Sequence, residues 1–236
     1  MATVPAMPKD TSAADARTLF GAAGWRQVGA GDWSWVFADP SDELAARVTP
    51  FDPGYRMFAE ACLAGRPNRW LPRMIEVLPL SRDGYVVLMQ RLWPAKPAEA
   101  SAFCAALGIA NDTGYDSPTA GPAVVADEPE LGALRGRIRD LIAEGQSRHR
   151  RWAVCDIREG NVMVDRAGQL KLIDPMGVGG WKIVEALRAG GTELPRDFSR
   201  SQLMDFLCIP YFGPGREGEV DKADLLERVA RLYDGA

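Results

Sequence analysis

The sequence predicts an α+β fold with two lobes, a mostly β N-terminal lobe and a mostly helical C-terminal lobe. Two observations predict it. From Gly24 to Trp93 short apolar runs alternate with turn residues, which is typical of a small antiparallel sheet. From Ala98 onward most apolar residues recur at helical spacing. The predicted divisions are an N-terminal arm at 1–20, a first lobe at 21–93 and a second lobe at 94–236.

In the first lobe the predicted order is strand, strand, helix, strand, strand. Residues 1–16 are rich in Ala, Thr, Pro and Ser and indicate a loose arm or a short docking helix. Turn residues at 39–42 and 81–84 separate the paired strands. This order favours an antiparallel sheet with one helix packed on it. The predicted elements are strands at Trp33–Phe37, Leu44–Thr49, Arg73–Leu78 and Tyr85–Met89, and a helix at Pro53–Gly65.

In the second lobe helices dominate, and a short hairpin interrupts them. Ser199 is a candidate N-cap for one of the closing helices. The stretch Asn111–Pro129 is rich in Gly, Pro and Asp and is expected to form a long loop. The predicted elements are helices at Ala98–Ile109, Glu130–Gln146, Ser199–Leu207 and Val220–Tyr233, and strands at Val162–Val164 and Leu170–Ile173.

Composition excludes several classes of protein. Of the 236 residues, 47% are hydrophobic and 25% are charged, which argues against wholesale disorder. The net charge of −4 gives no electrostatic reason to expect a nucleic-acid partner. No stretch approaches the roughly 20 apolar residues that span a bilayer, and the N-terminus lacks the apolar core of a signal peptide. We therefore expect a cytoplasmic protein with neither a membrane nor a nucleic-acid partner.

The cysteine and histidine content argues against a zinc site or a disulfide framework. The four cysteines are dispersed and form no CxxC pair, so reduced thiols are expected. The single histidine, His149, lies in a basic run that is expected to form a solvated helix end.

The most informative polar residues are Asp156, Asn161 and Asp174. A short predicted hairpin separates the last two, and its closure would bring all three side chains toward one point. Two carboxylates and an amide oxygen are hard ligands that suit Mg²⁺. One carboxylate can instead accept a proton from a hydroxyl while the other holds metal against phosphates. Taken singly, the same residues are also common in surface turns and caps.

The pattern Asp156-x4-Asn161, strand, turn, strand, Asp174 resembles the catalytic and metal-binding loops of the protein-kinase-like superfamily, which includes aminoglycoside and other small-molecule phosphotransferases. The resemblance implies a kinase-like fold that uses ATP and Mg²⁺. It implies that Asp156 is the catalytic base and that Asn161 and Asp174 are metal ligands. Arg158 occupies the place of a lysine that contacts the transferring phosphate in many Ser/Thr kinases.

The first lobe carries matching features. Gly29, Gly31 and Ser34 stand at the positions of the kinase glycine-rich hairpin, whose backbone covers the phosphates. Arg47 stands where kinases carry a phosphate-pairing lysine, and Glu60 where they carry its glutamate partner. The backbone around two further residues would bind adenine by the same resemblance; these residues are Gln90 and Leu92.

The chain also departs from the kinase pattern. Val154 replaces the usual histidine, Pro175 replaces the usual phenylalanine, and no Ala-Pro-Glu segment follows. The primary expectation is a protein Ser/Thr kinase-like enzyme that transfers the γ-phosphoryl group to an unidentified hydroxyl acceptor. The alternatives are a small-molecule phosphotransferase of the aminoglycoside-kinase type, favoured by the short C-terminal lobe, and a nucleotide-binding pseudokinase scaffold, favoured by Arg47 and Pro175.

Overall fold

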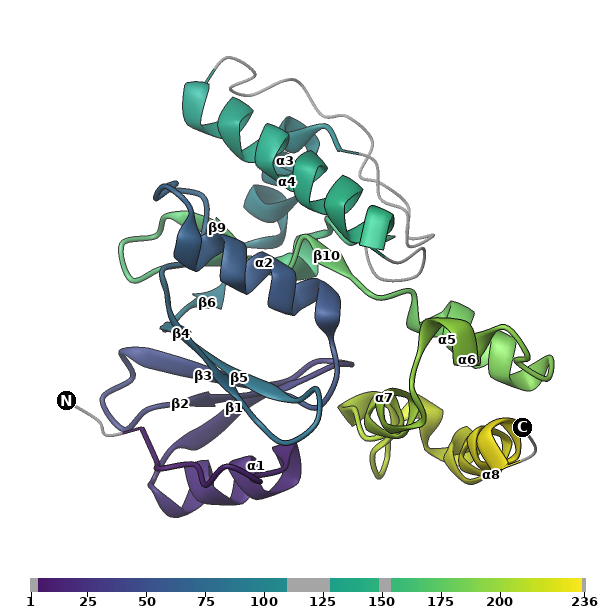
Figure 1. The fold of residues 1–236 in the computed structure, drawn as a ribbon. Helices are drawn as coiled ribbons and strands as arrows, with labels where there is room; N and C mark the ends of the chain where they lie inside the picture. The colour runs from purple at the N-terminus through teal and green to yellow at the C-terminus, as the bar shows by residue number, and fades with distance from the viewer. Residues whose placement is uncertain (1–3, 110–127, 149–153, 235–236) are drawn as a thin grey trace. The chain divides into compact units, whose positions relative to one another are not determined.

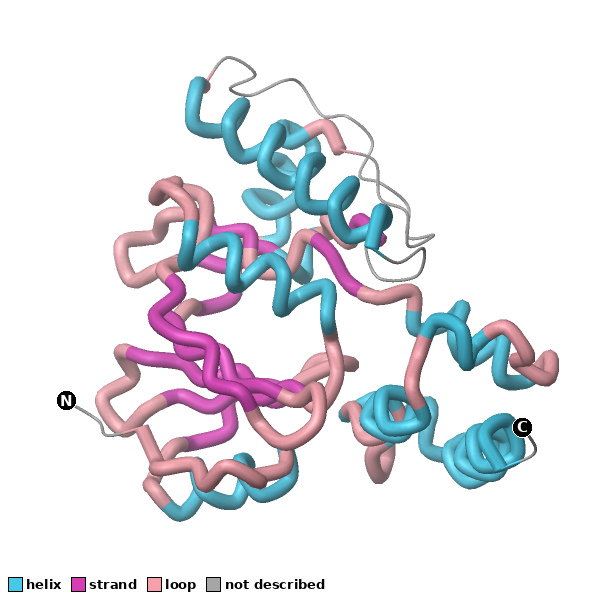
Figure 2. The backbone as a smooth tube through the Cα atoms, in the orientation of Figure 1, coloured by secondary structure: helices cyan, strands magenta, loops and turns pink. Residues whose placement is uncertain are grey.

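The computed structural model describes residues 4–109, 128–148 and 154–234. Most of the loop predicted at 111–129, and His149 with the part of its basic run that follows Arg148, lie outside these residues. The chain divides into two compact units. The first comprises residues 1–52, 76–88 and 180–236, and the second comprises residues 53–75 and 89–179. The predicted α+β class is confirmed, since strands of an antiparallel sheet precede a mostly helical remainder (Figures 1 and 2).

A five-stranded sheet in the order β1-β2-β3-β5-β4 supplies the β structure of the first unit, and the ends of β4 and β5 continue into the second. The β1–β2 and β2–β3 pairs are antiparallel, with Phe37 opposite Gln27 and Ala46. The strands are β1 (Arg26–Ala30), β2 (Trp35–Ala38), β3 (Leu44–Thr49), β4 (Met74–Pro79) and β5 (Tyr85–Gln90). Strand β2 starts at Trp35, two residues after the start predicted at Trp33. The reason is a turn that Gly31 closes by donating its backbone N–H to the Ser34 carbonyl.

Helix α1 (Ala13–Ala22) packs against this sheet, so the N-terminal segment contains the docking helix rather than only a loose arm. Ser12 and Asp15 form a capping box at its N-terminus. Its two buried residues, Ala16 and Phe20, join an apolar cluster that includes Trp25, Phe37, Ala46, Val48, Leu80, Val86 and Leu88. Each buried aromatic or aliphatic side chain contributes about 1.5–3 kcal/mol of transfer free energy to that core.

The first unit ends in short helices. The prediction for Ser199 is confirmed, because its hydroxyl accepts the Gln202 N–H while the Gln202 side chain accepts the Ser199 N–H. The elements are α5 (Gly180–Arg188), α6 (Leu194–Asp197), α7 (Arg200–Phe206), η2 (Pro210–Phe212), η3 (Glu217–Asp221) and α8 (Lys222–Asp234).

The described residues of the second unit form the helices α2, α3 and α4 and two small sheets. Strand β6 pairs with β8 and β8 with β9 in one antiparallel sheet, and β7 pairs with β10 in the other. The helices are α2 (Pro53–Ala64), α3 (Pro97–Leu107) and α4 (Pro129–Arg148). The remaining elements are β6 (Trp93–Pro94), β7 (Val154–Cys155), η1 (Glu159–Asn161), β8 (Val162–Val164), β9 (Leu170–Leu172) and β10 (Met176–Gly177).

None of the four cysteines, all of which lie in the described part of the chain, forms a disulfide. Burial raises the pKa of Cys62 and of Cys104 to about 12, which suppresses formation of the reactive thiolate at neutral pH. None of the helices in the described part of the chain combines the length and the apolar character that crossing a bilayer requires.

Candidate active site

Asp156 and Asn161 lie in direct contact in the second unit. Asp156 follows strand β7, and Asn161 ends the short helix η1. The Asn161 Nδ2 donates to the backbone carbonyl of Asp156 at 2.7 Å and to its Oδ2 at 2.9 Å. Asn161 is buried, so its amide is held in one orientation, with Oδ1 as its remaining acceptor. The pairing of these two residues, expected from their spacing, is present in the structure.

Asp174 is joined to both residues through the backbone on either side of it. The Ile173 N–H donates to the Asn161 carbonyl at 2.9 Å, and the Asp156 N–H donates to the Pro175 carbonyl at 2.9 Å. Strand β10 then pairs with β7, which places Met176 opposite Cys155. Asp174 is thus flanked by residues bonded to Asp156 and to Asn161, and the three sequence-predicted residues come together at one place.

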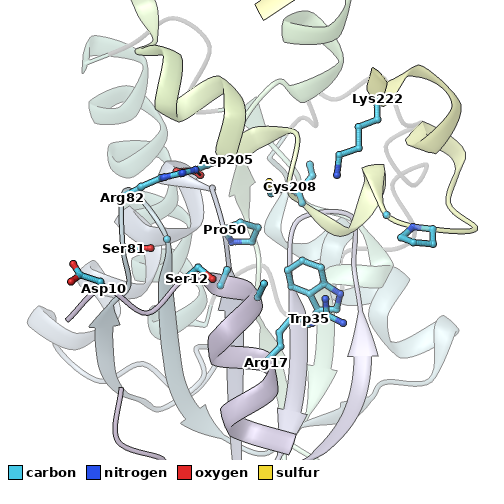
Figure 3. A pocket seen from close by; sticks show the side chains of 16 residues that line it. Asp10, Ser12, Arg17, Trp35, Pro50, Ser81, Arg82, Asp205, Cys208 and Lys222 are labelled. Atoms are coloured by element: carbon cyan, nitrogen blue, oxygen red, sulfur yellow. Dashed lines mark hydrogen bonds and ion pairs between the residues drawn. The ribbon is translucent and has the colours of Figure 1, made fainter. Parts of the chain in front are cut away.

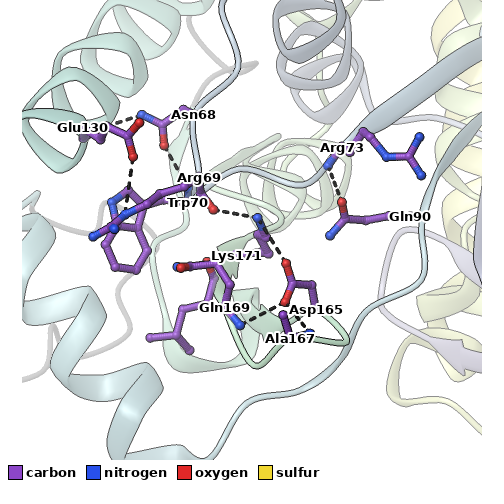
Figure 4. Close-up of polar contacts among 11 residues, drawn as sticks. Asn68, Arg69, Trp70, Arg73, Gln90, Glu130, Asp165, Ala167, Gln169 and Lys171 are labelled. Atoms are coloured by element: carbon purple, nitrogen blue, oxygen red, sulfur yellow. Dashed lines mark hydrogen bonds and ion pairs between the residues drawn. The ribbon is translucent and has the colours of Figure 1, made fainter.

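The hairpin β8–β9 supports this arrangement, and its turn is closed by Asp165. The Asp165 carboxylate accepts the backbone N–H of Ala167 and of Gln169, each at 3.0 Å (Figure 4). The left-handed backbone of Gly168, with φ of 80°, completes the turn. The register places Val162 opposite Leu172, so the hairpin separates Asn161 from Asp174 in sequence while returning the chain to the same point.

A second set of contacts fixes strand β9 to the segment before β4. Lys171 is buried, and its Nζ donates to the Arg69 carbonyl at 2.6 Å and lies 3.5 Å from the Asp165 carboxylate (Figure 4). The Leu172 N–H donates to the Trp70 carbonyl at 2.8 Å. Sequence analysis did not select Lys171, because a lysine in a short strand gives no sign of burial by itself. It is a positioning residue for the strand that leads to Asp174.

Arg158 forms an ion pair with Asp156. Its Nε lies 3.1 Å from Oδ1 and 3.3 Å from Oδ2 of that carboxylate, and 42% of its side chain is exposed. The Asp156 side chain is 18% exposed, so solvent reaches the pair. The predicted base and the predicted phosphate-contacting cation therefore lie next to each other, with the cation toward the solvent.

Oxygen ligands for a divalent cation are present at this place. Asn161 uses its Nδ2 on Asp156, which leaves its amide oxygen for a metal, and Asp174 supplies a carboxylate. Two oxygen ligands suit Mg²⁺, which keeps several of its waters when bound. No group of three or more His, Cys, Asp or Glu side chains within 4–109, 128–148 and 154–234 is arranged to hold a metal. The donor set fits a water-rich Mg²⁺ site and does not fit a closed structural metal centre.

In the first unit, the predicted glycine-rich hairpin is the β1–β2 hairpin. Gly29 lies in β1 after a β-bulge, and a Cβ added at Gly29 or Gly31 would meet no atom within 4 Å. Ser34 is buried in the turn. The space beside the two glycines allows close approach of a ligand to the backbone.

The tip of this hairpin contacts the C-terminal helical segment. Arg216 Nη2 donates to the Asp32 carboxylate at 2.8 Å, and the Tyr211 N–H donates to the Asp32 carbonyl at 3.0 Å. The Trp33 ring packs 5.6 Å from the ring of Phe206. Trp33 is therefore a packing residue. Sequence analysis missed Arg216 because Arg216 and its partner Asp32 lie far apart in the chain.

Arg47 and Glu60 each have an ion-pair partner that the resemblance does not provide. Arg47 is buried in β3, and its Nη2 lies 3.5 Å from the carboxylate of the equally buried Asp52. Glu60 is paired along α2, where Arg56 Nε donates to its carboxylate at 2.8 Å. Sequence analysis missed Asp52, which lies just before α2 and gives no motif signal. The role of both predicted residues toward phosphate stays a prediction.

Gln90 and Leu92, predicted to bind adenine through their backbone, lie at the end of β5 and just beyond it. The Gln90 N–H donates to the Arg73 carbonyl at 3.0 Å, and its side chain accepts the Arg73 N–H at 3.1 Å (Figure 4). The Leu92 carbonyl accepts a bond from the Arg91 guanidinium. The Gln90 N–H is thus already bonded to Arg73. Of the backbone groups of Gln90, only the carbonyl is left for the predicted contact with adenine.

Comparisons with known proteins give structural matches only. No protein-family model matches the chain, and no curated protein matches its sequence. A thermostable mutant of the aminoglycoside phosphotransferase APH(4)-Ia, in ternary complex with AMP-PNP and hygromycin B, is 14% identical, with 93% of this chain and 97% of that chain covered and a TM-score of 0.33. The apo form of a thermostable mutant of the same enzyme is 14% identical over 93% and 92% of the two chains, with a TM-score of 0.35. The aminoglycoside phosphotransferase APH(3'')-Id from Streptomyces rimosus is 15% identical over 92% and 95%, with a TM-score of 0.33. These solved chains are what the protein is similar to in structure.

Proposed function

We propose that this protein transfers the γ-phosphoryl group of ATP to a hydroxyl group of a small molecule. The observation that carries the proposal is the bonded arrangement of Asp156, Asn161 and Asp174. The amide of Asn161 holds the Asp156 carboxylate at 2.9 Å, and the backbone on both sides of Asp174 is bonded to the same two residues. A carboxylate fixed beside a candidate metal site is the arrangement that phosphoryl transfer to a hydroxyl needs.

Asp156 acts as the general base in this proposal. Its carboxylate accepts the hydroxyl proton while the acceptor oxygen bonds to the γ-phosphorus and the bond to the bridging oxygen of ADP breaks. Asn161 keeps the carboxylate oriented through Nδ2. A positioned base of this kind accelerates proton transfer by about 10²–10⁴-fold. Arg158, which pairs with Asp156, can exchange this contact for the phosphate charge that builds up beside it.

Asn161 and Asp174 are the residues that would hold Mg²⁺. The ion supplies positive charge against the phosphate oxygens of ATP. The amide oxygen of Asn161 and the carboxylate of Asp174 are the donors, and the Asn161 hydrogen bonds to Asp156 fix the direction in which that oxygen points.

The remaining predicted residues stay part of the proposal for ATP binding. The backbone of Gly29 and Gly31 offers close approach to phosphates, beside the buried turn residue Ser34. Leu92 and the carbonyl of Gln90 are the proposed adenine contacts. Arg47 contributes positive charge, and the carboxylate of its partner Asp52 weakens the electrostatic attraction of that charge for a phosphate.

The segment after Asp174 favours a small acceptor over a protein. Residues 176–177 form β10 at once, and helix α5 begins at Gly180. The residues between β10 and α5 are too few for the extended segment on which long protein kinases hold a peptide. This short connection favours the small-molecule alternative over the protein Ser/Thr kinase that the sequence analysis expected first.

Incubation with γ-labelled ATP and Mg²⁺ tests the proposal when products are separated by size. We expect label on small hydroxyl compounds of a mixed pool containing amino sugars, and none on a generic protein acceptor. Label that appears only on protein would restore the protein-kinase interpretation. Label that appears in neither fraction, with ATP still bound, would favour a nucleotide-binding scaffold.

The scaffold is the second candidate, and the Arg47–Asp52 pair is what favours it. A cation buried at 3.5 Å from a carboxylate is partly neutralised before any nucleotide arrives. A protein that binds a nucleotide without turnover can tolerate that loss, whereas a fast phosphotransferase gains from an available cation.

A further inference from the structure

A cavity of about 560 Å³ in the first unit is lined by none of the residues predicted for ATP, metal or acceptor. It is formed by the N-terminus of α1, the turn at 81–84, the segment after α7 and the start of α8 (Figure 3). The Ser81 N–H donates to the Thr11 carbonyl at 2.8 Å, which ties the turn to the chain before α1. A volume of this size accommodates a small organic ligand.

Arg17 places an uncompensated positive charge on the wall of this cavity. Its guanidinium stacks on the Trp35 ring, with the central carbon 4.1 Å from the ring centroid. Its Nε is buried and donates to no partner among the described residues, and no carboxylate within that part of the chain lies at ion-pair distance. Burial lowers the pKa of Arg17, although a guanidinium stays charged at neutral pH. A partly buried cation without a counter-charge is costly unless an anion joins it.

Lys222, the first residue of α8, adds a second positive charge to the lining of the cavity. It is half-buried, and over the residues that the structure describes it makes no ion pair. In Figure 3 its side chain extends from α8 toward the side of the cavity where Trp35 and Arg17 lie. Two cations from distant parts of the chain therefore face one cavity.

The acidic residues of the cavity do not neutralise these two cations. The buried Asp205 is paired with Arg82, whose Nη1 donates to it at 2.8 Å. Arg82 reaches this contact from a left-handed backbone with φ of 59°, an unfavourable conformation for a residue with a side chain. Asp10 is exposed. The lining thus carries three cations and two carboxylates, an excess of one positive charge.

Apolar residues make up part of the remaining lining. Trp35 lies in the lining with the Arg17 guanidinium over its ring, and the lining residues Pro50 and Ile209 are buried. We propose that this cavity binds a small organic anion, a molecule with one carboxylate or phosphate group held by Arg17 and Lys222 and a flat apolar body held against Trp35, Pro50 and Ile209. A charged head fixed by an arginine and a body stacked on an aromatic ring is a favourable combination for affinity and specificity.

Isothermal titration of the full chain with phenyl phosphate tests this site, with benzoate as a second anion. Benzyl alcohol tests the apolar body without the charge, and inorganic phosphate tests the charge without the body. We expect one-to-one binding of at least one aromatic anion, and binding on the order of tenfold weaker for either single-feature compound. Arg17→Gln and Lys222→Gln should each weaken the aromatic anion about tenfold, while Lys182→Gln, outside the cavity, should leave its affinity unchanged.

Several results would overturn the proposal. They are the absence of binding by both aromatic anions, unchanged affinity in both cavity variants, and an affinity for inorganic phosphate equal to that for the aromatic anions.

Titration in the presence of saturating AMP-PNP separates this cavity from a nucleotide site, because displacement of the anion by AMP-PNP would contradict an independent site. If Arg17→Gln lowers stability too far for titration, Lys222→Gln alone decides, since the half-buried Lys222 makes no ion pair with the described residues. The result does not depend on whether the protein transfers phosphate.

Discussion

The side-chain amide of Asn161 donates to two atoms of Asp156, the backbone carbonyl oxygen at 2.7 Å and Oδ2 at 2.9 Å. Asn161 therefore holds both the backbone and the side-chain carboxylate of Asp156, the residue proposed as the base. The carbonyl of the same Asn161 receives the Ile173 N–H at 2.9 Å, next to Asp174. Asn161 links the two acidic residues of the site, and its loss should affect both.

Asn161→Ala should abolish transfer and lower the free energy of unfolding by about 1–3 kcal/mol, because it removes two hydrogen bonds from a buried place. Asn68→Ala is the matched control. Asn68 also bonds the backbone, through the Trp70 N–H and the Glu130 carbonyl, but lies outside the proposed site. Transfer rates and urea unfolding are measured for both variants. An Asn161→Ala protein that is destabilised but transfers phosphate at the parent rate would assign Asn161 a purely structural role.

Asp174→Asn should weaken Mg²⁺-dependent nucleotide binding on the order of tenfold or more, because a neutral amide replaces the only charged ligand proposed for the ion. The measurement is the Kd of AMP-PNP at increasing Mg²⁺ concentration. In the presence of EDTA the parent and the variant should bind alike. The same response of both proteins to Mg²⁺ would show that Asp174 does not hold the ion.

Arg47→Met should cost about 3–5 kcal/mol of stability, since it removes the guanidinium that lies 3.5 Å from the buried Asp52 carboxylate. Combining it with Asp52→Asn should cost less than the sum of the two single changes, because the interaction is then already absent. Denaturant unfolding of the four proteins measures this coupling. Additive effects would mean that the 3.5 Å pair contributes nothing. The nucleotide affinity of Arg47→Lys, which keeps the charge, reports separately on a phosphate role.

Asp39 should make stability depend on pH in the acidic range. Burial by itself would raise the pKa of Asp39, but hydrogen bonds from Ser41, Leu44 and Glu43 outweigh it and hold the pKa below its usual value. The folded state therefore binds a proton less readily than the unfolded state, and the resulting stabilisation is present above the unfolded pKa of about 4.

That stabilisation is lost as the pH falls through the lower, folded pKa. Asp39→Asn should be less stable than the parent at pH 7, and the difference should shrink steadily below about pH 4. Thermal unfolding between pH 2 and pH 7 measures it. A difference that stays constant across this range would contradict the assigned hydrogen bonds.

The pattern of the sequence predicts local elements well. Short apolar runs bounded by turn residues identify β3 and β5 to within one residue, and the Ser199 cap marks the start of α7. The spacing of Asp156, Asn161 and Asp174 predicts their convergence, because a hairpin between Asn161 and Asp174 brings its two ends together.

Contacts between distant segments could not be predicted in the same way. The pairing of Arg47 with Asp52, the burial of Lys171 and the bond from Arg216 to Asp32 all depend on which segments the fold brings together. A charged residue has the same local signal whether it is solvated or buried against a partner. The cavity beside Arg17 also depends on segments that lie far apart in the sequence, from Asp10 to Lys222.

The central claim is that the Asp156 carboxylate acts on the acceptor hydroxyl, and Asp156→Asn tests it most directly. This change keeps the shape of the side chain and removes its basicity, and Asp140→Asn, an exposed position on α4, is the control. Single-turnover transfer from γ-labelled ATP should fall by about 10²–10⁴-fold in Asp156→Asn and stay unchanged in Asp140→Asn, with ATP affinity retained in both. Transfer by Asp156→Asn at the parent rate would contradict the claim.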